Sequence, residues 1–338
     1  MDFTLEAVLL IGLIVIALGF DMLNGLHDAA NSIATIVSTR VLPARYAVIW
    51  AAFFNFVAFL VFGQHVASTV GKGIVSANVI GDELIFGALM GAIVWNLFTW
   101  WRGLPSSSSH ALIGGLLGAG IAKAGFKAVV WDGVLKTIGG IVVSPALGFV
   151  LAIVLVLVVS WLFVKATPAF GDAVFRRMQF VSASLYSLGH GGNDAQKTMG
   201  VITALLFAHH RLSGAFHVPL WVVLSCQAAM GLGTLFGGWR IVHTMGSKIT
   251  RLSPQQGFCA ETGGAMTLFL FTNLGIPVST THTITGAIVG VGAARRTSAV
   301  RWNVASSIVW AWVITMPMAG VMGALFYWIA RLGGGFFG

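Results

Sequence analysis

Long apolar runs separated by short polar segments make up most of the chain. Examples of such runs are residues 8–20, 47–62, 141–164 and 304–330. A helix needs about 20 apolar residues to cross a bilayer, whereas a membrane β-strand alternates over about 10, so these runs predict spanning helices. We therefore expect an all-α integral membrane protein, a polytopic helical bundle in the cell membrane.

The composition agrees with lipid as the solvent. Of the 338 residues, 57% are hydrophobic and only 9% are charged, whereas soluble domains carry about 25% charged residues. The net charge of +9 comes without any basic run interleaved with aromatic residues, so it does not indicate nucleic-acid binding. Lysines and arginines cluster between apolar runs, which is typical of cytoplasmic loops.

A proline–hydroxyl–histidine motif occurs twice, each time before an apolar segment that contains glycines. Pro105-Ser-Ser-Ser-Ser-His110 returns as Pro277-Val-Ser-Thr-Thr-His282, 172 positions later (277 minus 105). Proline is common where a chain turns into the first residues of a helix. The first turn of a helix has unpaired backbone N–H groups and the positive end of the helix dipole, and both attract anions. A single serine run would indicate only a helix cap, but the recurrence favours an anion site. Its expected hydroxyl donors are Ser107, Ser108, Ser109, Ser279, Thr280 and Thr281.

Polar residues interrupt the apolar stretch that precedes each motif. Four of them are spaced 3, 4 and 3 apart and so share one helical face: Asp21, Asn24, Asp28 and Asn31. The spacing returns 166 positions later (194 minus 28): Ser187, His190, Asp194 and Lys197. Because a carboxylate is costly at bilayer depth, Asp28 and Asp194 indicate a functional site for a coupling cation or proton. We expect Gly25 and residues 26–28 to break or unwind the first helix.

Two halves, each with an acidic helix before a Ser/Thr-headed half-helix, are typical of transporters built from repeats. The first repeat is expected at residues 1–165, a linker at 166–180 and the second repeat at 181–338. A passive channel would not need the two aspartates. An enzyme is not expected, because the chain has no His-Glu-x-x-His motif and its hairpins carry no arginine or lysine.

Two converging sets of donors suit a tetrahedral oxyanion, and phosphate is the expected substrate. A protonated phosphate oxygen can donate a hydrogen bond to Asp28 or Asp194, whereas sulfate has no proton to donate, so a facing carboxylate would select for phosphate. A permease or channel for another oxyanion such as sulfate remains the alternative.

At these residues the chain resembles the inorganic phosphate transporter (PiT) family, whose signature Gly-Ala-Asn-Asp-Val-Ala-Asn-Ala occurs in each half. Here the blocks read Gly25-Leu-His-Asp-Ala-Ala-Asn-Ser32 and Gly191-Gly-Asn-Asp-Ala-Gln-Lys-Thr198. The resemblance implies cation-coupled symport of inorganic phosphate, inverted repeats with broken helices and re-entrant hairpins, a homodimer and a cytoplasmic linker. It implies as sodium ligands Asp28, Asn31, Asn193 and Asp194.

Three of the departures from the family signature bear on the coupling ion. His27 replaces an asparagine, while Gln196 and Lys197 replace an alanine and an asparagine. Lys197 lies one helical turn after Asp194 and would place an ammonium where a sodium ion would otherwise sit. Together with His27 beside Asp28, it favours proton coupling; sodium-coupled symport is the alternative.

Secondary candidates for the coupling ion are Asp21, Asn24, Gln196 and Glu261. No cofactor is expected beyond the co-transported proton or sodium ion. The sequence leaves open whether the chain carries free phosphate or a metal–phosphate complex.

Overall fold

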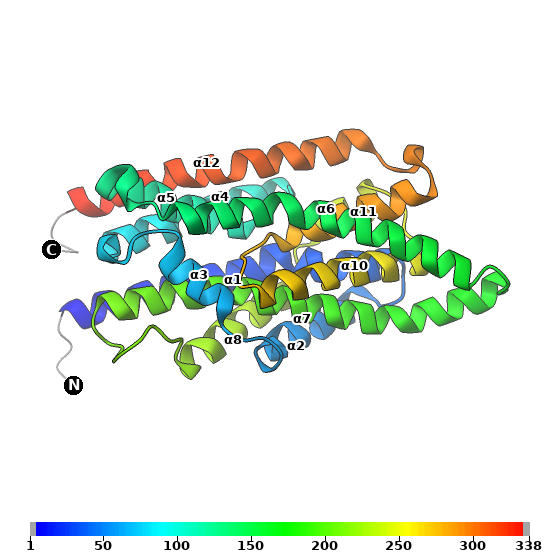
Figure 1. Cartoon of the computed structure of the whole chain (residues 1–338), viewed down its shortest axis with the longest axis horizontal. Coiled ribbons are helices and arrows are strands. Elements are labelled where there is room, and N and C mark those ends of the chain that lie inside the picture. Colours follow the sequence, from blue (N-terminus) through cyan, green and yellow to red (C-terminus); the bar gives the residue numbers. More distant parts are fainter. Residues whose placement is uncertain (1–4, 334–338) are drawn as a thin grey trace.

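The computed structural model describes residues 5–333, as two successive sets of helices in the same order (Figure 1). The first set comprises α1 (Leu5–Ser38), α2 (Ala44–Val57), α3 (His65–Gly73), α4 (Asp82–Arg102), α5 (Ser108–Ala124) and α6 (Trp131–Leu162). The second comprises α7 (Pro168–Ala208), α8 (Leu220–Phe236), α9 (Trp239–His243), α10 (Pro254–Asn273), α11 (Thr280–Arg295) and α12 (Trp302–Leu332). The π-helical turn η4 (Thr244–Lys248) continues α9. The expected all-α class is confirmed.

Several helices have the length and apolarity to cross a membrane. Within the described chain these are α1, α4, α5 with its short extension to Ala128, α6 and α12. Two further spans are possible if a bent pair counts as one: α2 and α3 meet at 81°, and α8 and α9 at 64°. The chain is a multi-pass membrane protein, as its apolar runs predict.

The acidic helices are continuous, so the expected break at Gly25 and residues 26–28 is wrong. A Cβ atom on Gly25 would lie 2.2 Å from the carbonyl oxygen of Met230 in α8. The glycine therefore permits close helix packing instead of interrupting the helix. The second acidic helix, α7, also runs unbroken, and it includes residues 168–180 of the stretch expected as a linker.

Helices α1 and α7 lie side by side and run antiparallel. The start of α1 meets the end of α7, where His209 contacts Glu6, and the end of α1 meets the start of α7, where Thr39 donates to Gln179. This arrangement brings Asp28 and Asp194 to similar depths. Figure 1 shows the end of the bundle where α1 and α4 finish and α7 and α12 begin. We call it the basic end, because these helix ends and their loops carry Arg40, Arg45, Arg102, Lys165, Arg176, Arg177, Arg295, Arg296 and Arg301.

The two hydroxyl motifs enter the bundle after matching turns. Gly103 (φ +66°) follows α4 and Gly275 (φ +68°) follows α10, and both adopt the left-handed conformation that favours glycine. Each turn is held by a threonine of a bent pair: Thr244 donates to the carbonyl of Gly103 (3.2 Å) and Thr69 to that of Gly275 (2.7 Å). The chain then returns into the bundle and begins α5 or α11.

Glycines let α5 pack closely on α12 and α11 pack closely on α6. A Cβ on Gly118 of α5 would lie 1.9 Å from the carbonyl of Gly320 in α12, and one on Gly290 of α11 would lie 2.5 Å from that of Phe149 in α6. Because such close contacts are disrupted by a single added methyl group, they fix the depth of both helices.

We expect Gly118→Ala to destabilise the protein by about 1–3 kcal/mol, because the added methyl group overpacks the contact between α5 and α12. The matched control is Gly139→Ala in α6, where a Cβ would meet no atom within 4 Å. That control should be neutral or slightly stabilising, since alanine favours a helix over glycine. Thermal unfolding in detergent measures both, and equal melting temperatures for the two variants would contradict the packing argument.

His209 provides a second test, at the opposite end from the basic end. Its Nδ1 lies 3.1 Å from Glu6 and its Nε2 lies 2.6 Å from Asp82. Partial burial lowers the pKa of His209, but hydrogen bonds and charges from Asp82 and Glu6 outweigh this effect, so the pKa is raised. Because the pKa of His209 is higher in the folded state, protonated His209 stabilises the fold. This stabilisation is present in full below the unfolded pKa of about 6.5, and it is lost as the pH rises through the raised pKa.

We therefore expect His209→Gln to lower the melting temperature at about pH 6 and to have much less effect at about pH 9. The control is His217→Gln, whose ring contacts only a nearby backbone carbonyl. A His209→Gln defect of equal size at both pH values would show that the ion pairs do not stabilise the fold.

Candidate functional site

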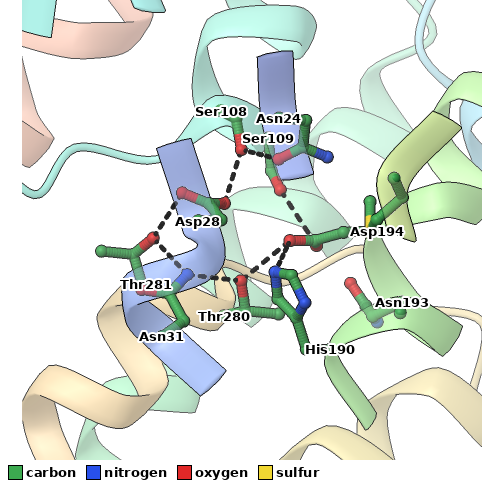
Figure 2. A network of polar contacts seen from close by, with 12 residues as sticks. Asn24, Asp28, Asn31, Ser108, Ser109, His190, Asn193, Asp194, Thr280 and Thr281 are labelled. Carbon is green, nitrogen blue, oxygen red and sulfur yellow. Dashed lines mark hydrogen bonds and ion pairs between the residues drawn. The ribbon is translucent and has the colours of Figure 1, made fainter. Parts of the chain in front are cut away.

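The first turns of α5 and α11 meet beside Asp28 and Asp194 (Figure 2). Ser108 donates to Asp28 at 2.7 Å, and Thr280 donates to Asp194 at 2.8 Å. Two longer bonds cross between the halves: Thr281 lies 3.4 Å from Asp28, and Ser109 lies 3.4 Å from Asp194. Each carboxylate therefore receives one hydroxyl from each half, in a pattern with twofold symmetry.

We call this group the hydroxyl–carboxylate cluster: Asp28, Asp194, Ser108, Ser109, Thr280 and Thr281. All of its members are at most 3% exposed. The cluster is thus closed to solvent from both ends in this conformation. The other two predicted donors, Ser107 and Ser279, serve as helix N-caps and accept the backbone N–H groups of His110 and His282.

The first half supports the cluster mainly with neutral groups. Asn31 donates to Thr280 at 3.2 Å and to Thr281 at 2.9 Å, which holds the start of α11 against α1. Asn24 contacts the hydroxyl of Ser108. His27 lies 2.9 Å from Asp28 and 3.1 Å from the hydroxyl of Thr99, so its ring links the cluster to α4.

The second half adds a charged side chain, that of Lys197, to the surroundings of the cluster. The ammonium group of Lys197 is buried and donates to Asp194, to Ser109 and to the carbonyl of Val278. His190 places its Nε2 3.3 Å from Asp194. Ligand atoms of Asp28, His190 and Asp194 lie within 4.8 Å of one another, so these three side chains have the spacing to hold a cation. The site combines hydroxyl donors for an anion with carboxylates for a cation.

Three of the predicted residues point to other partners. Asn193 bonds to Thr272 and to the backbone of Val278, and so braces the approach to α11. Gln196 accepts the backbone N–H groups of Val66 and Ala67 at the start of α3. Glu261 accepts hydrogen bonds from three side chains outside the cluster: Thr35, Gln179 and Ser182.

Asp21 differs from Asp28, Asp194 and Glu261 in its hydrogen bonding. It is fully buried in α1, and neither of its oxygens has a partner in hydrogen-bond geometry. Thr198 and Asn24 lie near it without completing such a bond, and Lys197 and Asp194 are close enough to interact electrostatically.

The sequence-based site omitted two residues that the structure places at the cluster. His190 occupies the position in α7 that Asn24 occupies in α1, so the 166-residue offset was a usable signal. Thr99 bonds to both His27 and Ser106 from the last turns of α4. No local motif marks Thr99, because only the close crossing of α1 and α4 brings it there.

Comparisons with known proteins identify the family of the chain. The phosphate transporter family matches residues 24–323. The chain belongs to the phosphate transporter family. It is 70% identical over 332 residues to a "probable low-affinity inorganic phosphate transporter" of Rhizobium meliloti, covering 98% of this chain and 99% of that protein. A protein of Bacillus subtilis with the same description is 45% identical, with 96% and 98% covered.

A solved structure described as "The sodium-dependent phosphate transporter" superposes with a TM-score of 0.87 at 28% identity. The match covers 96% of this chain and 99% of that one. This member of the phosphate transporter family is therefore a multi-pass protein of the plasma membrane and not an enzyme.

Proposed function

We propose that the chain is a symporter that imports inorganic phosphate together with protons, and that the hydroxyl–carboxylate cluster binds the phosphate. The observation that carries this proposal is the crossed set of hydroxyl bonds from α5 and α11 to Asp28 and Asp194. These hydroxyls would turn from the carboxylates to the phosphate oxygens, while backbone N–H groups at both helix starts add donors.

Charge balance in the cluster supports coupling to a cation. Asp28 and Asp194 supply two negative charges when ionised, and Lys197 supplies one positive charge. Phosphate adds at least one further negative charge at neutral pH. Because like charges repel strongly in a buried site of low dielectric, the anion would enter only together with a cation or proton.

Lys197 favours the proton as that cation. Its ammonium group already contacts Asp194, and so occupies one side of the carboxylate that a metal ion would need. Because the positive charge of Lys197 is part of the protein, fewer transported cations are needed to neutralise the site.

Asp21 is the proton carrier that we propose. A buried carboxylate whose oxygens have no partner in hydrogen-bond geometry is costly to ionise, which supports Asp21 as the group that carries the proton. Its charged neighbours are Lys197 and Asp194, and Cys226 of α8 faces it as well. When phosphate leaves and the cluster opens, Asp21 gains access to water and releases its proton.

Sodium coupling is the second candidate. It is supported by the description of the similar solved structure and by the spacing of Asp28, His190 and Asp194. An imidazole is a poor ligand for a hard cation such as sodium, which prefers oxygen, so we rank it second.

The two sets of helices also support an inverted repeat. Helices α1 and α7 run antiparallel, and the starts of α5 and α11 meet from opposite ends of the bundle. We include this relation in the proposal, since it would place equivalent turns at the two membrane faces.

Uptake of labelled phosphate into proteoliposomes, with sodium and pH gradients imposed separately, tests the coupling. We expect an inward proton gradient to drive accumulation without sodium. Strict dependence on sodium would overturn the proton assignment. Asp21→Asn should abolish accumulation driven by the pH gradient but leave exchange of labelled for unlabelled phosphate, because exchange needs no net proton movement.

The matched control is Asn96→Ala, since Asn96 is equally buried and unpartnered but cannot ionise. It should retain accumulation driven by the pH gradient. If Asp21→Asn also retained it, the proton would have to bind elsewhere.

Asp28→Asn tests the selection of phosphate over sulfate. Asp28 already accepts two hydroxyls, and a carboxylate can accept about four hydrogen bonds, so it can also accept the O–H of a protonated phosphate. We expect the asparagine to reduce the preference for phosphate about tenfold or more, measured as inhibition of uptake by competing sulfate. The surface variant Asp172→Asn is the control, and an unchanged ratio in Asp28→Asn would exclude this carboxylate as the selective group.

A further inference from the structure

A pocket of about 390 Å³ opens at the basic end, between the end of α4 and the bent segment α9–η4. Its lining consists of Arg102, Gly103, Trp239, Arg240, His243, Thr244 and Lys248. No carboxylate belongs to its lining, and its volume suits a small ligand. We call it the turn pocket.

The cations of the turn pocket converge from two elements. Arg102 comes from α4, whereas Arg240 and Lys248 come from α9 and η4. Arg240 donates to the carbonyl of Trp101, which uses one of its five N–H groups and orients its guanidinium at the pocket wall. Arginine forks and lysine ammonium groups are the usual partners of phosphate oxygens.

The pocket is mechanically connected to the hydroxyl–carboxylate cluster. Thr244 donates to the carbonyl of Gly103, and the N–H of Leu104 donates to the carbonyl of Thr99. The hydroxyl of Thr99 contacts His27, whose other ring nitrogen contacts Asp28. A ligand that draws α9–η4 onto the end of α4 therefore acts on the turn that precedes Ser108.

The lysines and arginines of the basic end would face the cytoplasm by the positive-inside rule. Scattered loop cations satisfy that rule anywhere on the surface. The turn pocket differs from such scattered cations, because its lysine and arginines line a single cavity. This cavity lies at the Gly103 turn, which would have to move if the hydroxyl–carboxylate cluster opened.

We propose that the turn pocket binds a phosphate-bearing anion on the cytoplasmic side, and that this ligand holds the Gly103 turn closed and slows transport. The ligand is either a soluble phosphate compound or the headgroup of an anionic lipid. The effect on transport rests on the phosphate symport proposed above, whereas the binding does not.

The test uses pyrophosphate as the soluble probe, trapped inside right-side-out membrane vesicles that contain the full chain. We expect it to lower the initial rate of labelled phosphate uptake about fivefold, within the usual range of coupling between sites. The double variant Arg102→Gln/Lys248→Gln should lose this inhibition and keep its basal uptake. The control Arg296→Gln/Arg301→Gln removes two charges from the same end, outside the pocket, and should remain inhibited.

A second experiment tests a lipid headgroup as the ligand. It uses purified protein in vesicles of phosphatidylcholine, with or without phosphatidylglycerol and without pyrophosphate. Slower uptake only with phosphatidylglycerol, abolished in the Arg102→Gln/Lys248→Gln variant, would identify a lipid headgroup as the ligand. Slower uptake only with pyrophosphate would identify a soluble compound.

Wild-type uptake that responds to neither ligand, or equal inhibition of both double variants, would overturn the turn-pocket proposal while leaving phosphate transport intact. If the wild type showed no phosphate uptake, the proposed function would fail instead. The pocket is then tested by pyrophosphate-dependent thermal stabilisation in detergent. Stabilisation lost in Arg102→Gln/Lys248→Gln supports binding, and its absence in the wild type refutes it.

Discussion

Two buried aspartates impose the main constraint on this fold. An ionised carboxylate in an apolar interior is strongly destabilised unless several donors surround it. Asp28 and Asp194 obtain hydroxyl donors only where the starts of α5 and α11 reach the same depth, and each carboxylate takes one hydroxyl from each half. The glycine contacts of α5 on α12 and of α11 on α6 set that depth. The contacts that define the site therefore also hold the two halves together.

A carrier must open its site to each side in turn, and the fold offers a separate contact for each side. Thr69 of the first half holds the turn at Gly275 in the second half, and Thr244 of the second half holds the turn at Gly103 in the first. Both contacts are single hydrogen bonds, each of which stabilises a structure by about 1 kcal/mol. The two bonds share no residue, so each turn is held independently of the other.

The sequence predicted the helical class, the spanning runs and the whole hydroxyl–carboxylate cluster, because apolar run length is a local signal and the two repeat offsets can be read directly from the chain. The aspartates and the four hydroxyls at the centre were all among the predicted site residues. Its main error was the break at Gly25, since glycine looks the same in sequence whether it interrupts a helix or permits the approach of Met230. Thr99 and the partners of Glu261 were not predicted, because they depend on which helices cross, and no single-sequence pattern encodes that.

The two sets of helices share a scaffold but differ in the charge that they bring to the hydroxyl–carboxylate cluster. Asn31 and Lys197 occupy equivalent positions and both brace hydroxyls, yet only Lys197 brings a charge. The turns at Gly103 and Gly275 are also equivalent, but cations surround only the first, while the second packs on His65. A perfectly symmetric carrier would treat its two sides alike. The fixed charge of the cluster lies on α7, and two of the cations beside Gly103, Arg240 and Lys248, lie on α9–η4, so an asymmetry between the two sides would originate mainly in the second set of helices.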